Sequence, residues 1–180
     1  DPIDGTREFV EGIPEWCVSI GLVEDGLPVA GGIFNPATDE LVLGALETGV
    51  TYNGHPSQVR DPEALTDVTV LASRSETRRG EWQRFEGAPF AVKACGSVAY
   101  KMALVAAGRA ESTWTLVPKS EWDVAAGTAL VRAAGGQVTL ADGTEPFFNK
   151  EKPVFPNFVA AGPRVVTALL NGWLERPADA

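Results

Sequence analysis

The chain has 180 residues, of which 44% are apolar and 22% are charged, as in an ordinary globular domain. This composition excludes a disordered, collagen-like or coiled-coil chain, and no apolar run reaches the roughly 18 residues that a membrane-spanning helix needs. The net charge of −9 would repel a nucleic-acid backbone, so we expect neither a membrane nor a nucleic-acid polymer as partner.

The first part of the chain predicts an antiparallel meander of short strands. Apolar runs there are separated by turn sequences such as Asp25-Gly26, Asn35-Pro36 and Asn53-Gly54. The predicted strands are 16–23, 29–34, 41–46 and 49–52.

From residue 68 onward, predicted strands alternate with helices. The strands are 68–72, 90–94, 110–116, 137–140 and 158–161, and the helices are 76–85, 98–107, 121–134 and 163–175. Gly108 marks a helix end, and Pro163 suits a first helical turn. Residues 144–157 have the least predicted structure. This order favours an α+β or α/β fold of layered sheets and helices over residues 1–180, in which the change near residue 60 could mark a subdomain seam.

Cysteine and histidine contents limit the chemistry. Cys17 and Cys95 are isolated and lack CxxC spacing, so we expect reduced thiols, which fits a cytoplasmic protein. The only histidine, His55, follows a turn sequence and is predicted to lie in a loop. A Ser-His-Asp triad or a histidine-rich zinc site is therefore not expected.

The opening sequence, Asp1-Pro2-Ile3-Asp4-Gly5-Thr6, carries the strongest chemical signal. Two carboxylates three residues apart can face one point if the backbone turns between them. Gly5 permits such a turn, and Thr6 can begin a short helix whose free N–H groups suit a phosphate oxygen. Together they offer oxygen ligands for Mg²⁺ beside an anion site. The alternative is an aspartate-rich turn on a solvated acidic surface.

A second carboxylate, Asp123, stands near the start of the predicted helix 121–134. There it can be an N-cap, which is the simpler interpretation, or it can complete a cation site. The small residues Ala125, Ala126 and Gly127 allow that helix to approach another backbone closely.

The two aspartate motifs together resemble a known family. Asp-Pro-Ile-Asp-Gly-Thr at 1–6, Trp-Asp-x-Ala-Ala-Gly at 122–127 and Ala-Gly-Gly at 134–136 are similar to the inositol monophosphatase superfamily of metal-dependent, lithium-sensitive phosphomonoesterases. The resemblance extends over nearly the whole chain. It implies an α+β fold, a layered αβαβα sandwich, and allows a homodimer.

The resemblance also implies a metal site with two or three Mg²⁺ ions. Asp1 would bridge metals, Ile3 would offer its backbone carbonyl, and Asp4 and Asp123 would bind the second metal. Asp4 is in this sense expected to be catalytic.

Substrate contacts follow from the same resemblance. Gly5 and Thr6 would present N–H groups to the phosphate, and the catalytic Thr6 hydroxyl would help to orient the attacking water. Further candidates for contact with the substrate are Gly96, Ser97, Lys101 and Arg74. For Arg74 and Lys101, simple solvation at the surface is an equal alternative.

One family element is not found in residues 1–180. A Gly-Glu-Glu-like segment that supplies a metal-binding glutamate, and an aspartate that helps to activate water, normally precede the Asp-Pro-Ile-Asp-Gly-Thr motif. We therefore expect a fragment that begins partway through the active site and is impaired alone.

Three hypotheses follow for function. The first is a Mg²⁺-dependent phosphomonoesterase acting on a small soluble ester, either inositol monophosphate or a 3′(2′),5′-bisphosphate nucleotide such as 3′-phosphoadenosine 5′-phosphate. Arg7-Glu8-Phe9 and Ala72-Ser73-Arg74-Ser75 resemble the bisphosphate nucleotidase branch. The second is a non-catalytic homologue that binds Mg²⁺ and phosphate weakly, and the third is an acidic domain without a ligand.

Overall fold

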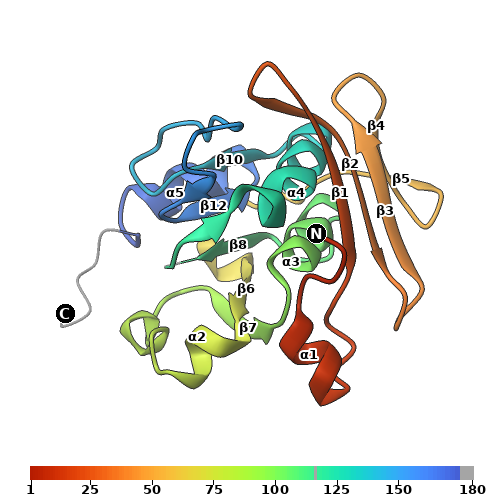
Figure 1. Ribbon diagram of the computed structural model, residues 1–180. Coiled ribbons are helices and arrows are strands. Elements are labelled where there is room, and N and C mark those ends of the chain that lie inside the picture. The colour runs from red at the N-terminus through yellow and green to blue at the C-terminus, as the bar shows by residue number, and fades with distance from the viewer. Residues whose placement is uncertain (116, 175–180) are drawn as a thin grey trace.

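The computed structural model describes residues 1–115 and 117–174. Its first sheet is a five-stranded antiparallel meander in the order β1-β2-β3-β4-β5 (Figure 1). The strands are β1 (Val18–Glu24), β2 (Leu27–Asn35), β3 (Glu40–Ala45), β4 (Gly49–Tyr52) and β5 (His55–Ser57). The predicted meander is confirmed, but His55 lies in an edge strand and not in a loop.

The second sheet is mixed and has the order β10-β12-β8-β6-β7. Its strands are β6 (Thr69–Ser73), β7 (Ala91–Cys95), β8 (Ser112–Thr115), β10 (Gln137–Thr139) and β12 (Phe158–Ala161). β6 runs parallel to both β7 and β8, whereas β12 is antiparallel to β8 and β10. All five correspond to predicted strands, although Leu116 at the end of one prediction lies outside the described residues.

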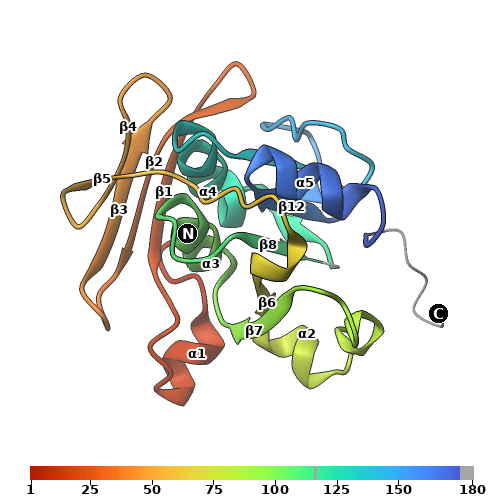
Figure 2. The ribbon, with the colours of Figure 1, turned by 180° about the vertical axis from the view of Figure 1, so that it is seen from behind.

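Helices α3 (Val98–Ala106) and α4 (Glu121–Ala133) fill the space between the sheets (Figures 1 and 2). Helix α5 (Pro163–Leu170) and an aromatic cluster around Trp82 and Trp114 cover the other face of the second sheet. The described residues thus form sheet, helix, sheet and helix layers, which confirms the predicted α+β class.

Small residues let α4 approach the first sheet closely, as its sequence predicted. A Cβ atom on Gly21 would lie 2.7 Å from the Ala126 nitrogen, and one on Gly31 would lie 2.6 Å from the Ala126 oxygen. Side chains at either glycine would separate the helix from the sheet. This contact places the start of α4 beside β1, where the candidate site lies.

The face of the first sheet that points away from α4 carries exposed apolar side chains. Ile20, Gly32 and Leu43 are neighbours across β1, β2 and β3, and the side chains of Ile20, Leu22 and Leu43 are exposed. Among residues 1–115 and 117–174, no helix is both long and apolar enough to cross a membrane.

Some predicted elements differ from the structure. The predicted helix 76–85 is two short pieces, α2 (Arg74–Arg78) and the 3₁₀ turn η2 (Gln83–Phe85), because Gly80 between them takes a φ of +82°. Helix α5 ends at Leu170, and its predicted end, Glu175, lies outside the described residues.

Besides β5, four short elements were not predicted, or were predicted only in part. Strand β11 (Val154–Phe155), inside the segment with least predicted structure, pairs with β9 (Lys119–Ser120) just before α4. Helix α1 (Thr6–Glu11) and the 3₁₀ turn η1 (Leu65–Asp67) complete the described elements.

Two carboxylates, Glu111 and Asp61, connect the segment between the two sheets to its neighbours. The buried Glu111 accepts a hydrogen bond from the Thr69 N–H and pairs with Arg60 at 2.7 Å. Asp61 accepts hydrogen bonds from the backbone N–H groups of Arg164 and Val165, at 3.0 and 3.2 Å. Asp61 therefore caps a helix about 100 residues further along the chain. The division near residue 60 into subdomains stays a prediction.

Replacing Asp61 with alanine should lower the free energy of unfolding by about 1–2 kcal/mol, because α5 loses both its cap and a favourable charge at its N-terminus. Urea denaturation would measure the change. Asp61→Asn, which keeps a side-chain oxygen, should lose less than half as much. Equal stability of Asp61→Ala and the unaltered chain would contradict this role.

Candidate metal and phosphate site

Three carboxylates from distant parts of the sequence meet at one point. Ligand oxygens of Asp1, Asp4 and Asp123 all lie within 4.8 Å of one another, and each residue is partly buried. Hard oxygen donors in this number suit Mg²⁺, which takes few protein carboxylates and completes its shell with water and phosphate oxygens. The donor set therefore fits the metal that the sequence predicted.

The backbone of the opening motif is held beside the strand β1. Asp1 exchanges two hydrogen bonds with Ser19, through its α-amino group and its carbonyl, at 2.8 and 2.9 Å. Asp4 exchanges two more with Cys17, at 2.9 and 3.0 Å. Between them the Ile3 N–H donates to Asp1 Oδ1 at 2.9 Å, which turns the chain so that both carboxylates face the same side.

Asp4 is also bound by the start of α3. Its Oδ2 atom accepts hydrogen bonds from the Ser97 hydroxyl at 2.6 Å and from the Ala99 N–H at 2.7 Å. Because the positive end of a helix dipole attracts a carboxylate, this contact holds the Asp4 side chain at the start of α3.

Asp123 occupies the third position of α4 and not its N-cap. The N-cap is Ser120, whose backbone N–H donates to Asp123 Oδ2 at 3.2 Å in a capping box. The N-cap interpretation was therefore wrong, although the carboxylate does help to begin the helix. Burial, reinforced by the charge of Asp4, raises the pKa of Asp123.

Gly5 and Thr6 connect this cluster to α1. Gly5 has a φ of +90°, and a Cβ atom there would lie 2.8 Å from the Glu15 carbonyl oxygen, so a side chain is excluded on two grounds. The Thr6 hydroxyl donates to the Ile3 carbonyl at 3.3 Å. The catalytic candidate Thr6 and the ligand candidate Ile3 are thus in contact.

A cavity of about 220 Å³ opens beside Asp4, Gly5 and Thr6. Gly96 and Ser97 line it, together with the cationic side chains of Arg7, Lys101 and Lys119. The carboxylates of Asp4 and Glu8 line the same cavity, so basic side chains that suit an anion lie beside one carboxylate of the candidate metal cluster.

Lys101 is almost fully buried, so the alternative of a solvated surface lysine is wrong. Its Nζ donates to the Cys95 carbonyl at 3.4 Å, and burial lowers the pKa of its ammonium group. Cys17 and Cys95 are free and buried, and burial raises the pKa of each thiol to about 12. Both thiols are therefore protonated at neutral pH.

Arg74 does not line the cavity but binds Glu15. Its Nη2 lies 2.6 Å from each Glu15 oxygen, and its Nε lies 3.1 Å from Oε2. The sequence predicted neither this partner nor the position of Arg7 in the cavity, whereas Lys119 was expected near the pocket and does line it. No local pattern could have shown the Arg74–Glu15 contact, which joins residues 59 positions apart.

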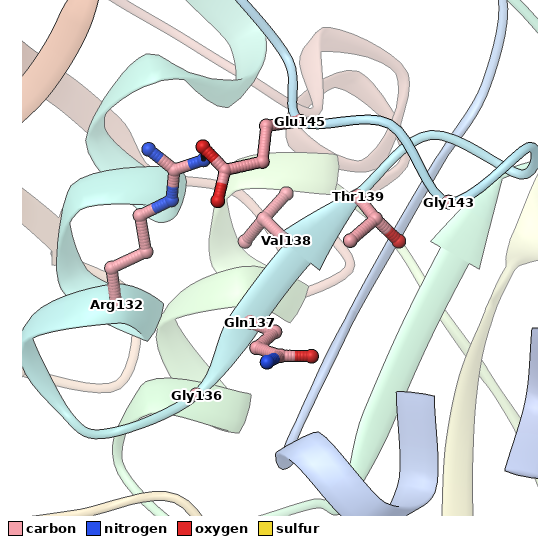
Figure 3. A pocket seen from close by; sticks show the side chains of 7 residues that line it. All are labelled: Arg132, Gly136, Gln137, Val138, Thr139, Gly143 and Glu145. Atoms are coloured by element: carbon pink, nitrogen blue, oxygen red, sulfur yellow. Dashed lines mark ion pairs between the residues drawn. The ribbon is translucent and has the colours of Figure 1, made fainter. Parts of the chain in front are cut away.

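A second cavity, of about 370 Å³, lies at the other end of α4 (Figure 3). Arg132 and Glu145 face each other there, with 3.7 Å between Nη2 and Oε2, next to the strand β10. Nine helical residues separate Arg132 from Asp123, or about 14 Å along the axis. This cavity is therefore separate from the carboxylate cluster and contains none of the predicted site residues.

The model of the inositol monophosphatase family matches residues 1–175. The chain belongs to this family. The fold and the two aspartate motifs agree with that membership, and the predicted resemblance is confirmed.

Named relatives cover nearly all of this chain but are longer. An inositol-1-monophosphatase from Rhizobium meliloti is 32% identical over 184 residues, which cover 98% of this chain and 66% of the relative. An inositol-1-monophosphatase from Mesorhizobium japonicum is 34% identical over 187 residues, which cover 100% of this chain and 68% of the relative. The chain thus spans about two thirds of the length of these curated relatives.

The fold agrees with a solved structure of the family. The inositol monophosphatase from Anabaena (Nostoc) has a TM-score of 0.85 and 33% identity to this chain, with 99% of this chain and 71% of that chain covered.

Replacing Asp123 with asparagine should stabilise the metal-free protein at neutral pH. A raised carboxyl pKa means that the folded state favours the protonated form, so ionisation of Asp123 costs stability above that pKa. Thermal unfolding in a chelator would show a higher melting temperature for Asp123→Asn, and this gain should shrink as the pH falls. A lower melting temperature of Asp123→Asn at neutral pH would contradict this electrostatic cost. Added Mg²⁺ should raise the melting temperature of the unaltered chain only.

Proposed function

We propose that this chain carries most of the active site of a Mg²⁺-dependent phosphomonoesterase, which hydrolyses a small soluble phosphate ester by attack of water. The observation that supports it best is the meeting of Asp1, Asp4 and Asp123 within 4.8 Å beside a cavity with three cationic side chains. Family relatives named inositol-1-monophosphatase support the same reaction class.

In this proposal Asp1, Asp4, Asp123 and the Ile3 carbonyl hold two or three Mg²⁺ ions. When bound, Mg²⁺ supplies an activated water and offsets negative charge on the phosphoryl oxygens. The chain itself then needs no nucleophilic side chain, which agrees with the protonated state of its two thiols. Ser97 and the Ala99 N–H keep the Asp4 carboxylate oriented through their hydrogen bonds to Oδ2.

The phosphate would lie in the cavity beside α1. Gly5 and Thr6 offer the first N–H groups of that helix, which have no partners within the helix. In this proposal the Thr6 hydroxyl, 3.3 Å from the Ile3 carbonyl, would orient a water molecule near the cluster. Gly96, Ser97 and Lys101 line the same cavity.

The substrate in this proposal is inositol monophosphate or a 3′(2′),5′-bisphosphate nucleotide such as 3′-phosphoadenosine 5′-phosphate. Three basic side chains line the cavity together with the Glu8 carboxylate, and in this proposal they would accommodate an ester with a second anionic group. Arg7, whose Nη1 donates to the Ser75 hydroxyl at 2.7 Å, lines the cavity with Ser75 and would contact such a group. Lithium inhibition, a homodimer and a cytoplasmic location belong to the same proposal.

A second candidate is a non-catalytic homologue that binds Mg²⁺ and phosphate only weakly. The composition of the carboxylate cluster is the observation that favours it. The cluster found among the described residues has three carboxylates, without the glutamate expected from the family pattern.

Phosphate release separates these candidates. We expect the chain to release phosphate from at least one of the two substrates only with Mg²⁺, at the impaired rate expected of it alone. Asp123→Asn should reduce that rate more than about 100-fold. Loss of an outer-shell partner of a metal ligand already costs about 10–100-fold, and Asp123 is proposed to be a direct ligand.

The matched control is Asp142→Asn, at an exposed turn aspartate bound to Thr144, which should leave the rate unchanged. Binding of Mg²⁺ without turnover would favour the non-catalytic homologue. Turnover that persists without Mg²⁺ and in Asp123→Asn would refute the metal-dependent mechanism.

A further inference from the structure

The turn formed by Gly96 and Ser97 has a strained backbone. Ser97 takes a φ of +52° and a ψ of 122°, a conformation that residues other than glycine rarely adopt. Such a conformation persists only where surrounding contacts hold it, and it is often found at functional sites. The contacts that hold Ser97 therefore indicate the function of this conformation.

The strained conformation directs two donors to Asp4. The Ser97 hydroxyl and the Ala99 N–H both bind Asp4 Oδ2, and the Ser97 hydroxyl also accepts from the Tyr100 N–H at 3.0 Å. If Ser97 relaxed to a negative φ, its hydroxyl would leave Asp4. The orientation of one carboxylate in the cluster thus depends on this turn.

Glu15 holds the turn from the other side. Its Oε2 accepts the Gly96 N–H at 2.6 Å. Gly96 has no room for a side chain, because a Cβ atom would lie 2.3 Å from Glu8 Cγ, so Gly96 is confined between Glu8 and Glu15. Residue 15 also lies two positions before Cys17, whose backbone pairs with Asp4 and whose Sγ lies 3.4 Å from the Ser97 hydroxyl oxygen.

Arg74 orients the Glu15 carboxylate. The planar guanidinium binds both oxygens in a fork, which fixes the plane of the carboxylate and directs Oε2 toward Gly96. The pair is only partly exposed, at 29% for Arg74 and 20% for Glu15, so it is less screened than a surface ion pair. Figures 1 and 2 show α1, β7 and α2 gathered at the lower end of the molecule.

We propose that Glu15, oriented by Arg74, is a positioning residue for the carboxylate cluster. It holds Gly96 so that Ser97 keeps its strained conformation and binds Asp4. Arg74, predicted from sequence as a substrate contact, instead acts through Glu15. The consequence for metal binding rests on the proposed function, whereas the effect on the turn can be measured without metal.

A double-mutant cycle with Mn²⁺ as the probe tests the metal-binding consequence. We expect Glu15→Ala to weaken Mn²⁺ binding by about 3- to 10-fold in electron paramagnetic resonance titrations, less than the roughly 10–100-fold of a direct outer-shell partner. Glu15→Gln, which keeps an oxygen for Gly96, should restore affinity to within about twofold. In a Ser97→Gly background, Glu15→Ala should add less than about twofold, because the two residues act in series.

Hydrogen exchange of the Ala99 amide tests the turn itself in metal-free protein. Glu15→Ala should speed this exchange several-fold, whereas Glu81→Ala, which breaks the exposed Arg79–Glu81 pair, should not. If Glu15→Ala does not fold, Arg74→Ala should show the same acceleration to a smaller degree.

Unchanged Ala99 exchange in a folded Glu15→Ala or Arg74→Ala protein would overturn the proposal. So would a lower melting temperature with unchanged Mn²⁺ affinity, which is the result of a merely structural role. If the unaltered chain binds no Mn²⁺, the proposed function fails, and Ala99 exchange still decides the positioning role.

Discussion

The hydrogen bonds to Asp4 Oδ2 connect the parts of the molecule on which the site depends. Through the Ser97 hydroxyl and the Ala99 N–H, this oxygen attaches the opening motif to the start of α3. The backbone of Asp4 pairs with Cys17, which leads into β1. The first sheet, the helices between the sheets and the candidate metal site therefore meet at one carboxylate.

This arrangement places like charges together at a cost in stability. Asp123 lies in the same cluster as Asp4, and burial together with that neighbouring charge raises its pKa. A structure without a function for these groups would gain stability by neutralising one of them. Their position beside a helix N-terminus and three basic side chains agrees with the proposed site for metal ions and a phosphate.

Local patterns allowed much of the fold to be predicted. The strands Gly49–Tyr52 and Phe158–Ala161 have the predicted bounds, because apolar runs and turn residues define them within a few positions. The predicted helix 76–85 was wrong because the left-handed Gly80 interrupts it, and its sequence pattern alone did not reveal that conformation.

The candidate site was predictable only where its residues lie in recognisable motifs. Asp1, Asp4 and Asp123 belong to such motifs, and the structure brings them together. Glu15 has no motif, and its partners Arg74 and Gly96 are 59 and 81 positions away. Contacts between residues so far apart in the sequence depend on how the sheets and helices pack, which no local spacing specifies.

In the proposed site, Asp1, Asp4 and Asp123 together bind divalent metal. Crystals of the chain soaked in Mn²⁺ would reveal such binding through the anomalous scattering of the ion. We expect at least one strong peak in contact with these carboxylates, and its loss in Asp123→Asn. Peaks only elsewhere, or no ordered ion at saturating Mn²⁺, would contradict this proposal.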